Sequence, residues 1–125
     1  MKTTIRVLIA DDRIRSRKGL RALLSTCAAI EVVGEAANGR ETMRMVEAYQ
    51  PNVVVMDAKM PAVSGLAATR AIKARWPDVR VVVLTMYGSY RADAVASGAD
   101  TFLVKGCPTD ELLKAVLNHQ EVELC

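Results

Sequence analysis

Short apolar runs alternate along this chain with longer segments in which apolar residues recur three or four positions apart. The run VVVM at 53–56 has no polar face. Such a run is typical of a strand that is buried on both sides in a parallel sheet. The predicted strands cover residues 5–10, 31–36, 53–57, 79–85 and 101–104.

Segments with helical periodicity separate these strands. Asn38 followed by Glu41 resembles a capping box at the start of one of them, and Pro51 and Pro77 mark the ends of two. The predicted helices cover about 14–25, 38–50, 66–76, a short Ala-rich segment ending near 97, and 109–118. This alternation predicts an α/β fold in which a five-stranded parallel sheet carries helices on both faces.

Composition narrows the class of protein without naming a function. The 125 residues suffice for one domain, and 51% of them are hydrophobic but only 4% aromatic. A net charge of +3 is too small to indicate nucleic-acid binding without a motif. No segment has the layout of a membrane span or a signal peptide, so we expect a cytoplasmic protein.

The cysteines and the single histidine carry no recognisable motif. Cys27, Cys107 and Cys125 are an odd number without metal-like spacing, and we expect small apolar fillers in a reducing compartment rather than a disulfide framework. His119 follows the last predicted helix, where it is expected to cap carbonyl groups, and it is assigned no function.

Four of the five predicted strands end on polar residues of distinct chemistry. Asp11 and Asp12 follow the first strand, Asp57 ends the third, Thr85 ends the fourth and Lys105 follows the fifth. Parallel strands end at a common edge of the sheet, so we expect these side chains to converge there. Taken singly, each has a structural alternative: a helix cap for Asp11, a strand terminus for Thr85 and a surface lysine for Lys105.

The chemistry of this set is that of phosphoryl transfer. Neighbouring carboxylates either raise one another's pKa or hold a cation, and hard oxygen ligands suit Mg²⁺. Asp57 is the candidate nucleophile, which would form an aspartyl-phosphate. Thr85 offers a hydroxyl and Lys105 a positive charge to the phosphoryl oxygens.

Several motifs together resemble the receiver domain of bacterial two-component response regulators, over about residues 5–117. They are the acidic pair at 11–12, MDAKMP at 56–61, Gly65, LTM at 84–86 and GADTFLVK at 98–105. The resemblance implies the flavodoxin-like (βα)5 fold. GLRALL at 19–24 and VVVLTM at 81–86 look most like the NarL/LuxR-type transcription regulators, in which a DNA-binding helix-turn-helix follows a linker.

The resemblance assigns a role to each residue of the set. It implies that Asp57 is the phosphoacceptor and that Asp11 and Asp12 hold Mg²⁺ together with it. The main-chain carbonyl of Lys59 would be a further metal ligand, and Lys105 would pair with the phosphate. The implied partner that donates the phosphoryl group is a sensor histidine kinase.

The resemblance also implies a switch. Phosphate would draw the hydroxyl of Thr85 toward it, and Phe102 would turn inward, although Phe102 could equally be plain core. The surface of the fourth helix, last strand and last helix would then change, altering homodimerisation and hence transcription. The protein would be no enzyme, apart from assisting its own phosphorylation and dephosphorylation.

The resemblance also implies domain limits, and alternative functions stay open beside it. We expect a receiver domain at 1–120 and the start of a linker or tail at 121–125, with DNA bound only through a domain absent from this chain. The alternatives are a stand-alone receiver acting through protein–protein contacts, a degenerate receiver, and a Mg²⁺-dependent phosphohydrolase. Lys59 disfavours the last, because such enzymes usually have an acid at that position.

Some positions depart from the family pattern. Ser64 replaces the aspartate that commonly precedes the glycine of the loop. Arg15 and Ser16 stand where apolar residues are usual, and GCP at 106–108 replaces acidic and small residues.

The first predicted helix is unusually basic. Arg13, Arg17 and Arg21 lie four positions apart, so they share one face of the helix. They form either a solvated surface or a docking stripe for an acidic partner, and both interpretations stay open.

Overall fold

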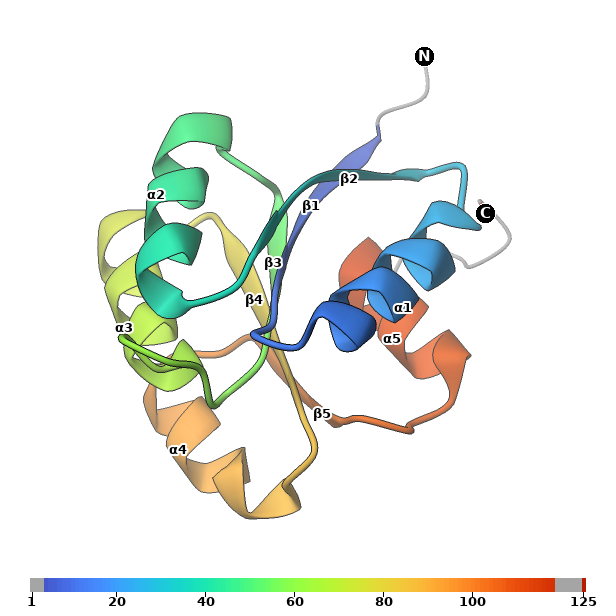
Figure 1. Cartoon of the computed structure of the whole chain (residues 1–125). Helices are drawn as coiled ribbons and strands as arrows, with labels where there is room; N and C mark the ends of the chain where they lie inside the picture. Colours follow the sequence, from blue (N-terminus) through green and yellow to red (C-terminus); the bar gives the residue numbers. More distant parts are fainter. Residues whose placement is uncertain (1–3, 119–124) are drawn as a thin grey trace.

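The computed structural model describes residues 4–118 and residue 125, and within them strands and helices alternate as predicted (Figure 1). The strands are β1 (Ile5–Ala10), β2 (Ile30–Ala36), β3 (Val53–Met56), β4 (Arg80–Thr85) and β5 (Thr101–Val104). The helices are α1 (Ile14–Ser25), α2 (Gly39–Tyr49), α3 (Gly65–Arg75), α4 (Arg91–Ala96) and α5 (Thr109–Leu117), with a 3-10 turn at Gly88–Tyr90 before α4. His119 and residues 121–124 of the predicted tail lie outside the described residues.

All neighbouring strands pair in parallel, in the order β2-β1-β3-β4-β5. The strand order reverses between β1 and β3, which is where open α/β sheets bind ligands. Ala10 pairs with Met56 at the ends of these two strands, and the Asp57 amide donates to the Ala10 carbonyl oxygen over 2.9 Å. Asp11 and Asp57 therefore leave the sheet side by side.

The side chains of each strand point alternately to the two faces of the sheet, and a separate layer of helices covers each face. Val54 and Met56 of β3 join the cluster under α2, α3 and α4, whereas Val53 and Val55 join the cluster under α1 and α5. Figure 1 shows these two groups of helices on opposite faces of the sheet. β3 is buried along its whole length, as its apolar run predicted. Within the described part of the chain, no helix is both long and apolar enough to span a membrane.

Side-chain caps open the two helices that flank β3. The Asn38 side chain accepts from the Glu41 amide over 2.8 Å, as the predicted cap requires. The Ser64 hydroxyl accepts from the Ala67 amide over 3.1 Å and so caps α3. The resemblance leads us to expect an aspartate at position 64. Serine can replace it and still cap α3, because both residues are good N-caps.

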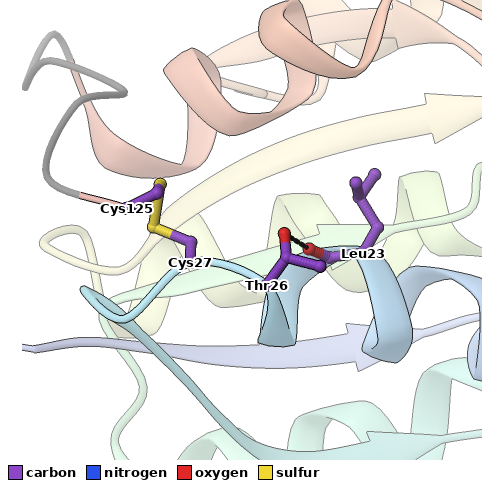
Figure 2. The surroundings of a disulfide bond; sticks show 4 residues. All are labelled: Leu23, Thr26, Cys27 and Cys125. Carbon is purple, nitrogen blue, oxygen red and sulfur yellow. Dashed lines mark hydrogen bonds between the residues drawn. A yellow bond between two sulfur atoms is a disulfide. The ribbon is translucent and has the colours of Figure 1, made fainter.

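The cysteines differ from the prediction. Cys27 is buried, as expected of an apolar filler, but its sulfur is bonded to that of Cys125, 98 positions away (Figure 2). Cys107 is a free thiol. The expectation of unpaired fillers is therefore wrong for Cys27 and Cys125. The count and spacing of cysteines could not reveal the pair, because connectivity depends on how the fold brings distant segments together.

Candidate functional site

Five side chains from four strand ends gather at the carboxyl edge of the sheet. One carboxylate oxygen from each of Asp11, Asp12 and Asp57 lies within 4.8 Å of the other two. Lys105 and Thr85 come to the same edge, and the Lys105 amide donates to the Thr85 carbonyl oxygen over 2.7 Å. The structure thus places together the residues that the strand-end pattern singled out.

Lys105 joins two of the three carboxylates. Its Nζ donates to Asp11 Oδ2 over 2.7 Å and to Asp57 Oδ2 over 3.1 Å. Burial alone would lower the pKa of Lys105, but the hydrogen bonds to Asp11 and Asp57 outweigh it, and the pKa is raised. The ammonium group therefore stays charged and offsets part of the repulsion among the carboxylates.

Asp11 is the most enclosed of the acids, at 1% exposed. Its Oδ1 accepts from the Arg13 amide over 2.9 Å, and its Oδ2 accepts from both Lys105 and the Ser16 hydroxyl. Burial would raise the pKa of Asp11, but the hydrogen bonds from Lys105, Ser16 and Arg13 outweigh it, and the pKa is lowered. The structural alternative considered for Asp11 was a helix cap. The N-cap residue of α1 is Arg13, so Asp11 does not have that role.

Ser16 is a site residue that sequence reasoning missed. The sequence marked it only as a departure from an apolar pattern, yet its hydroxyl lies 2.5 Å from Asp11 Oδ2. Ser16 is in the first turn of α1, the helix that follows the acidic pair, so its position could have suggested a contact with the strand end. Which face of that turn would meet Asp11 depends on how α1 packs, and the local sequence does not define this.

Asp12 and Asp57 line a cleft of about 320 Å³ that opens from the carboxyl edge. Lys59 and Thr85 also line it. The Asp57 carboxylate forms an ion pair with Lys105 and also lines the cleft. A donor molecule can therefore approach Asp57 through this cleft, while Asp11 stays enclosed behind it.

The loop after β3 is built closely around Asp57. The Gly65 amide donates to the Ala58 carbonyl oxygen over 3.0 Å, which brings the start of α3 back against the strand end. A Cβ atom at Gly65 would lie only 1.6 Å from the Asp57 carbonyl oxygen. Only glycine fits here without moving the backbone that carries the candidate phosphoacceptor.

Thr85 and Phe102 lie on the neighbouring strands β4 and β5. Thr85 is buried at the end of β4, and Phe102 is buried on β5 in the cluster under α2, α3 and α4. The Arg91 guanidinium of α4 lies 4.8 Å from the centre of the Phe102 ring. Phe102 is therefore buried against α4 in this structure, and its role in a switch stays a prediction.

Two of the three arginines of α1, Arg17 and Arg21, bind within the molecule. Glu35 on β2 forms ion pairs with both Arg17 and Arg21, at 3.3 and 2.5 Å, and Arg17 also donates to the Asp11 carbonyl oxygen over 2.8 Å. Arg13 lines the cleft instead. The basic stripe of Arg13, Arg17 and Arg21 is therefore neither simply solvated nor wholly available for docking. The sequence interpretation did not include pairing of these arginines within the domain.

Comparison with known proteins places this geometry in a family. The model of the response regulator receiver domain matches residues 7–117. The chain is 37% identical over 114 residues to the transcriptional regulatory protein DegU of Brevibacillus brevis, covering 90% of this chain and 48% of DegU. It is 38% identical to the DNA-binding transcriptional activator DevR/DosR of Mycobacterium tuberculosis, covering 90% and 52%. The chain thus spans about half the length of these curated relatives.

Solved structures of response regulators have the same fold as this chain. The signal receiver domain of NarL from Mycobacterium tuberculosis has a TM-score of 0.87 at 30% identity, covering 93% of this chain and 95% of that one. A LuxR-family two-component response regulator from Aurantimonas sp. SI85-9A1 has the same score and identity, covering 93% and 84%. With the family model spanning most of its length, this chain belongs to the response regulator receiver domain family, and its relatives include regulators of the NarL/LuxR type.

Proposed function

We propose that this domain is a phosphorylation-controlled switch whose phosphoacceptor is Asp57. The observation that carries the proposal is the position of Lys105, which bridges Asp11 and Asp57 beside a third carboxylate at the mouth of a cleft. An aspartate exposed only toward such a cleft is placed for attack on an incoming phosphorus atom. A histidine kinase is the donor that membership in the family supports.

In the proposed reaction, an Asp57 carboxylate oxygen attacks the phosphorus of a phosphohistidine or of a small phosphodonor. The phosphorus–oxygen bond forms as the bond to the leaving group breaks. Lys105 is close enough to transfer its ion pair from Asp57 to a phosphoryl oxygen, and Thr85 can donate its hydroxyl to another. Both residues would thereby stabilise the charge that Asp57 receives.

The donor set fits a hard divalent cation. Three carboxylates whose oxygens converge within 4.8 Å match the oxygen ligands that Mg²⁺ prefers. Asp11, Asp12 and Asp57, with the main-chain carbonyl of Lys59, are the proposed ligands. Mg²⁺ bound there would neutralise negative charge on the phosphoryl oxygens.

Intact-mass spectrometry tests the proposal. With Mg²⁺ and acetyl phosphate, the wild-type mass should rise by one phosphoryl group, and Asp57→Asn should abolish the gain. Asp78→Asn, an equal change of charge at an exposed loop position, should label like wild type. A gain that persists in Asp57→Asn would place the acceptor elsewhere.

Coupling to output is proposed to pass through Thr85. Phosphate would draw the Thr85 hydroxyl toward the cleft, favour the buried position of Phe102, and alter the surface of α4, β5 and α5. Thr85→Ala should then accept phosphate but lose the change in homodimerisation, followed by light scattering. Wild-type dimerisation by that variant would show that coupling takes another route.

The proposed output is control of transcription in the cytoplasm. DegU and DevR/DosR are named as transcription regulators, and this chain covers about half of each. We propose that residues 1–120 are the receiver unit, that 121–125 begin a linker or tail, and that DNA is bound by a separate domain. A receiver acting through protein–protein contacts alone is the alternative.

A further inference from the structure

The Cys27–Cys125 disulfide is unexpected for the cytoplasmic location proposed above. Reducing conditions there make stable disulfides rare, and those that form are mostly transient, catalytic or redox-sensing. We propose that Cys27 and Cys125 form a thiol–disulfide exchange site, which takes low-molecular-weight thiols and dithiols as its reductants. Exchange at this site controls whether residue 125 is covalently held at the end of α1.

Cys27, the first cysteine of the pair, is held in place by backbone hydrogen bonds and by packing. The Cys27 amide donates to the Leu24 carbonyl oxygen over 3.1 Å, and the Cys27 carbonyl oxygen accepts from the Ile30 amide over 3.0 Å. Cys27 is 1% exposed and belongs to the apolar cluster under α1 and α5. Figure 2 shows its sulfur directed from the turn after α1 toward Cys125.

The other half is accessible. Cys125 is an exposed residue and Cys27 is buried, so we expect an incoming thiolate to attack the sulfur of Cys125. Attack at the Cys125 sulfur forms a mixed disulfide there and releases Cys27, which takes up a proton. A second thiol then attacks the mixed disulfide, leaving two protein thiols and one oxidised disulfide of the reductant. Glutathione disulfide reverses the sequence, with Cys125 reacting first.

The third cysteine stands apart from this exchange. Cys107 lies in the loop between β5 and α5, whereas the disulfide lies near Ile30, where β2 begins at the opposite edge of the sheet. Burial and the nearby Glu111 carboxylate raise the pKa of Cys107, which disfavours its thiolate. Cys107 is therefore an internal control, present in the same chain but outside the site.

The exchange site is also remote from the phosphoacceptor. Asp57 follows the carboxyl end of β3, and the disulfide lies at the amino edge of the sheet, so neither site shares a residue with the other. The proposal does not depend on phosphorylation. Reduction should leave labelling of Asp57 by acetyl phosphate unchanged, which keeps the two tests separate.

Alkylation followed by intact-mass measurement tests the site in the whole 125-residue chain. Protein purified without reductant and unfolded in the presence of iodoacetamide should take up one group, at Cys107, and protein treated with dithiothreitol should take up three. Cys107→Ser should retain the bond. Folded, reduced protein should return from three groups to one after exposure to glutathione disulfide. Three groups in the absence of reductant, or no return to one, would overturn the proposal.

Two further variants test the order of attack. In Cys27→Ala, glutathione disulfide should add one glutathione to Cys125, because no partner remains to displace it. In Cys125→Ser, the buried Cys27 of the folded protein should stay a free thiol under the same conditions. Equal glutathione addition in the two variants would overturn the asymmetry on which the site rests.

Discussion

Asp57 keeps its position because the chain that follows it returns at Gly65, where the missing side chain leaves room for the Asp57 carbonyl oxygen. On the other side, Lys105 and the Asp57 carboxylate meet at 3.1 Å. Asp11 is fixed in the same way by donors on both of its oxygens. At the residue scale, the site is thus defined by a few close contacts that single substitutions can remove.

Gly65→Ala should damage both the fold and the site. The new Cβ would lie 1.6 Å from a backbone oxygen, so the loop must move, and overpacking of this kind costs about 3 kcal/mol. Phosphoryl uptake from acetyl phosphate should fall as well. Gly19→Ala is the matched control: its Cβ meets nothing within 4 Å, so an exposed helical glycine should gain about 0.5–1 kcal/mol. Equal effects of the two changes in urea unfolding would contradict this description of the loop.

Ser16→Ala should destabilise the metal-free protein in a pH-dependent way. A hydrogen bond to a charged carboxylate contributes about 1.5–3 kcal/mol, so a loss near the lower figure is expected at pH 7 in EDTA. The pKa of Asp11 lies below its usual 3.8 in the folded state. Its contribution is therefore present above pH 3.8 and is lost as the pH falls through the lower, folded value.

Urea unfolding of wild type and Ser16→Ala at several pH values measures this difference. The gap between the two proteins should stay constant from pH 7 to pH 5 and shrink in more acidic solution. Ser16→Thr, which keeps a hydroxyl, should recover part of the loss. A gap that does not change with pH would mean that Ser16 acts through packing and not through the Asp11 carboxylate.

At the scale of elements, α1 is joined to β2 by charge as well as by apolar packing. Glu35 pairs with Arg17 and Arg21, and these three side chains range from mostly buried to about half exposed. Ion pairs at such positions contribute little, since solvent screens them. They nevertheless hold Arg17 and Arg21 beside Glu35, and so limit how a partner protein could use these two arginines.

Glu35→Gln should cost less than about 1 kcal/mol in urea at low ionic strength, and the cost should shrink further at high salt. Glu47→Gln, which breaks a fully surface pair with Arg75, should cost less still. Salt-dependent unfolding of both variants checks this. A cost for Glu35→Gln that does not shrink at high salt would mean that Glu35 acts through packing and not through its pairs with Arg17 and Arg21.

The elements themselves were the most predictable part of the molecule. A wholly apolar run such as 53–56 and the prolines that end helices at 51 and 77 carry strong local signals, and the observed bounds differ from the predicted ones by at most one residue. The convergence of strand-end residues was also predictable, because parallel strands end at one edge. Which α1 side chains meet Asp11 and Glu35 was not, because this depends on how the helix packs.

Long-range pairing was the least predictable part. Nothing near Cys27 or Cys125 in the sequence indicates that they meet, since 98 positions separate them and only the folded chain brings them together. The buried position of Phe102 likewise depends on α4, whose Arg91 lies over its ring. Local patterns define elements and their edges, whereas such contacts depend on the assembled layers.

At the scale of the whole molecule, charge is distributed unevenly. The chain carries a net charge of +3, yet one edge of the sheet concentrates three carboxylates, two of which pair with Lys105. Lys105 cannot neutralise all three, so the metal-free site stores repulsion that a cation or the loss of one charge would relieve. We expect these distant residues to act together as one metal-binding site.

Thermal melting of wild type and Asp57→Asn, in EDTA and in millimolar Mg²⁺, measures whether the three carboxylates share a cation. In EDTA the variant should be more stable by about 1 kcal/mol, because it removes one of three crowded negative charges while Lys105 keeps its contact with Asp11. Mg²⁺ should raise the melting temperature of wild type by mass action, and that of the variant much less. If Asp57→Asn melts below wild type in EDTA, and Mg²⁺ shifts neither protein, the three carboxylates do not form a shared metal site.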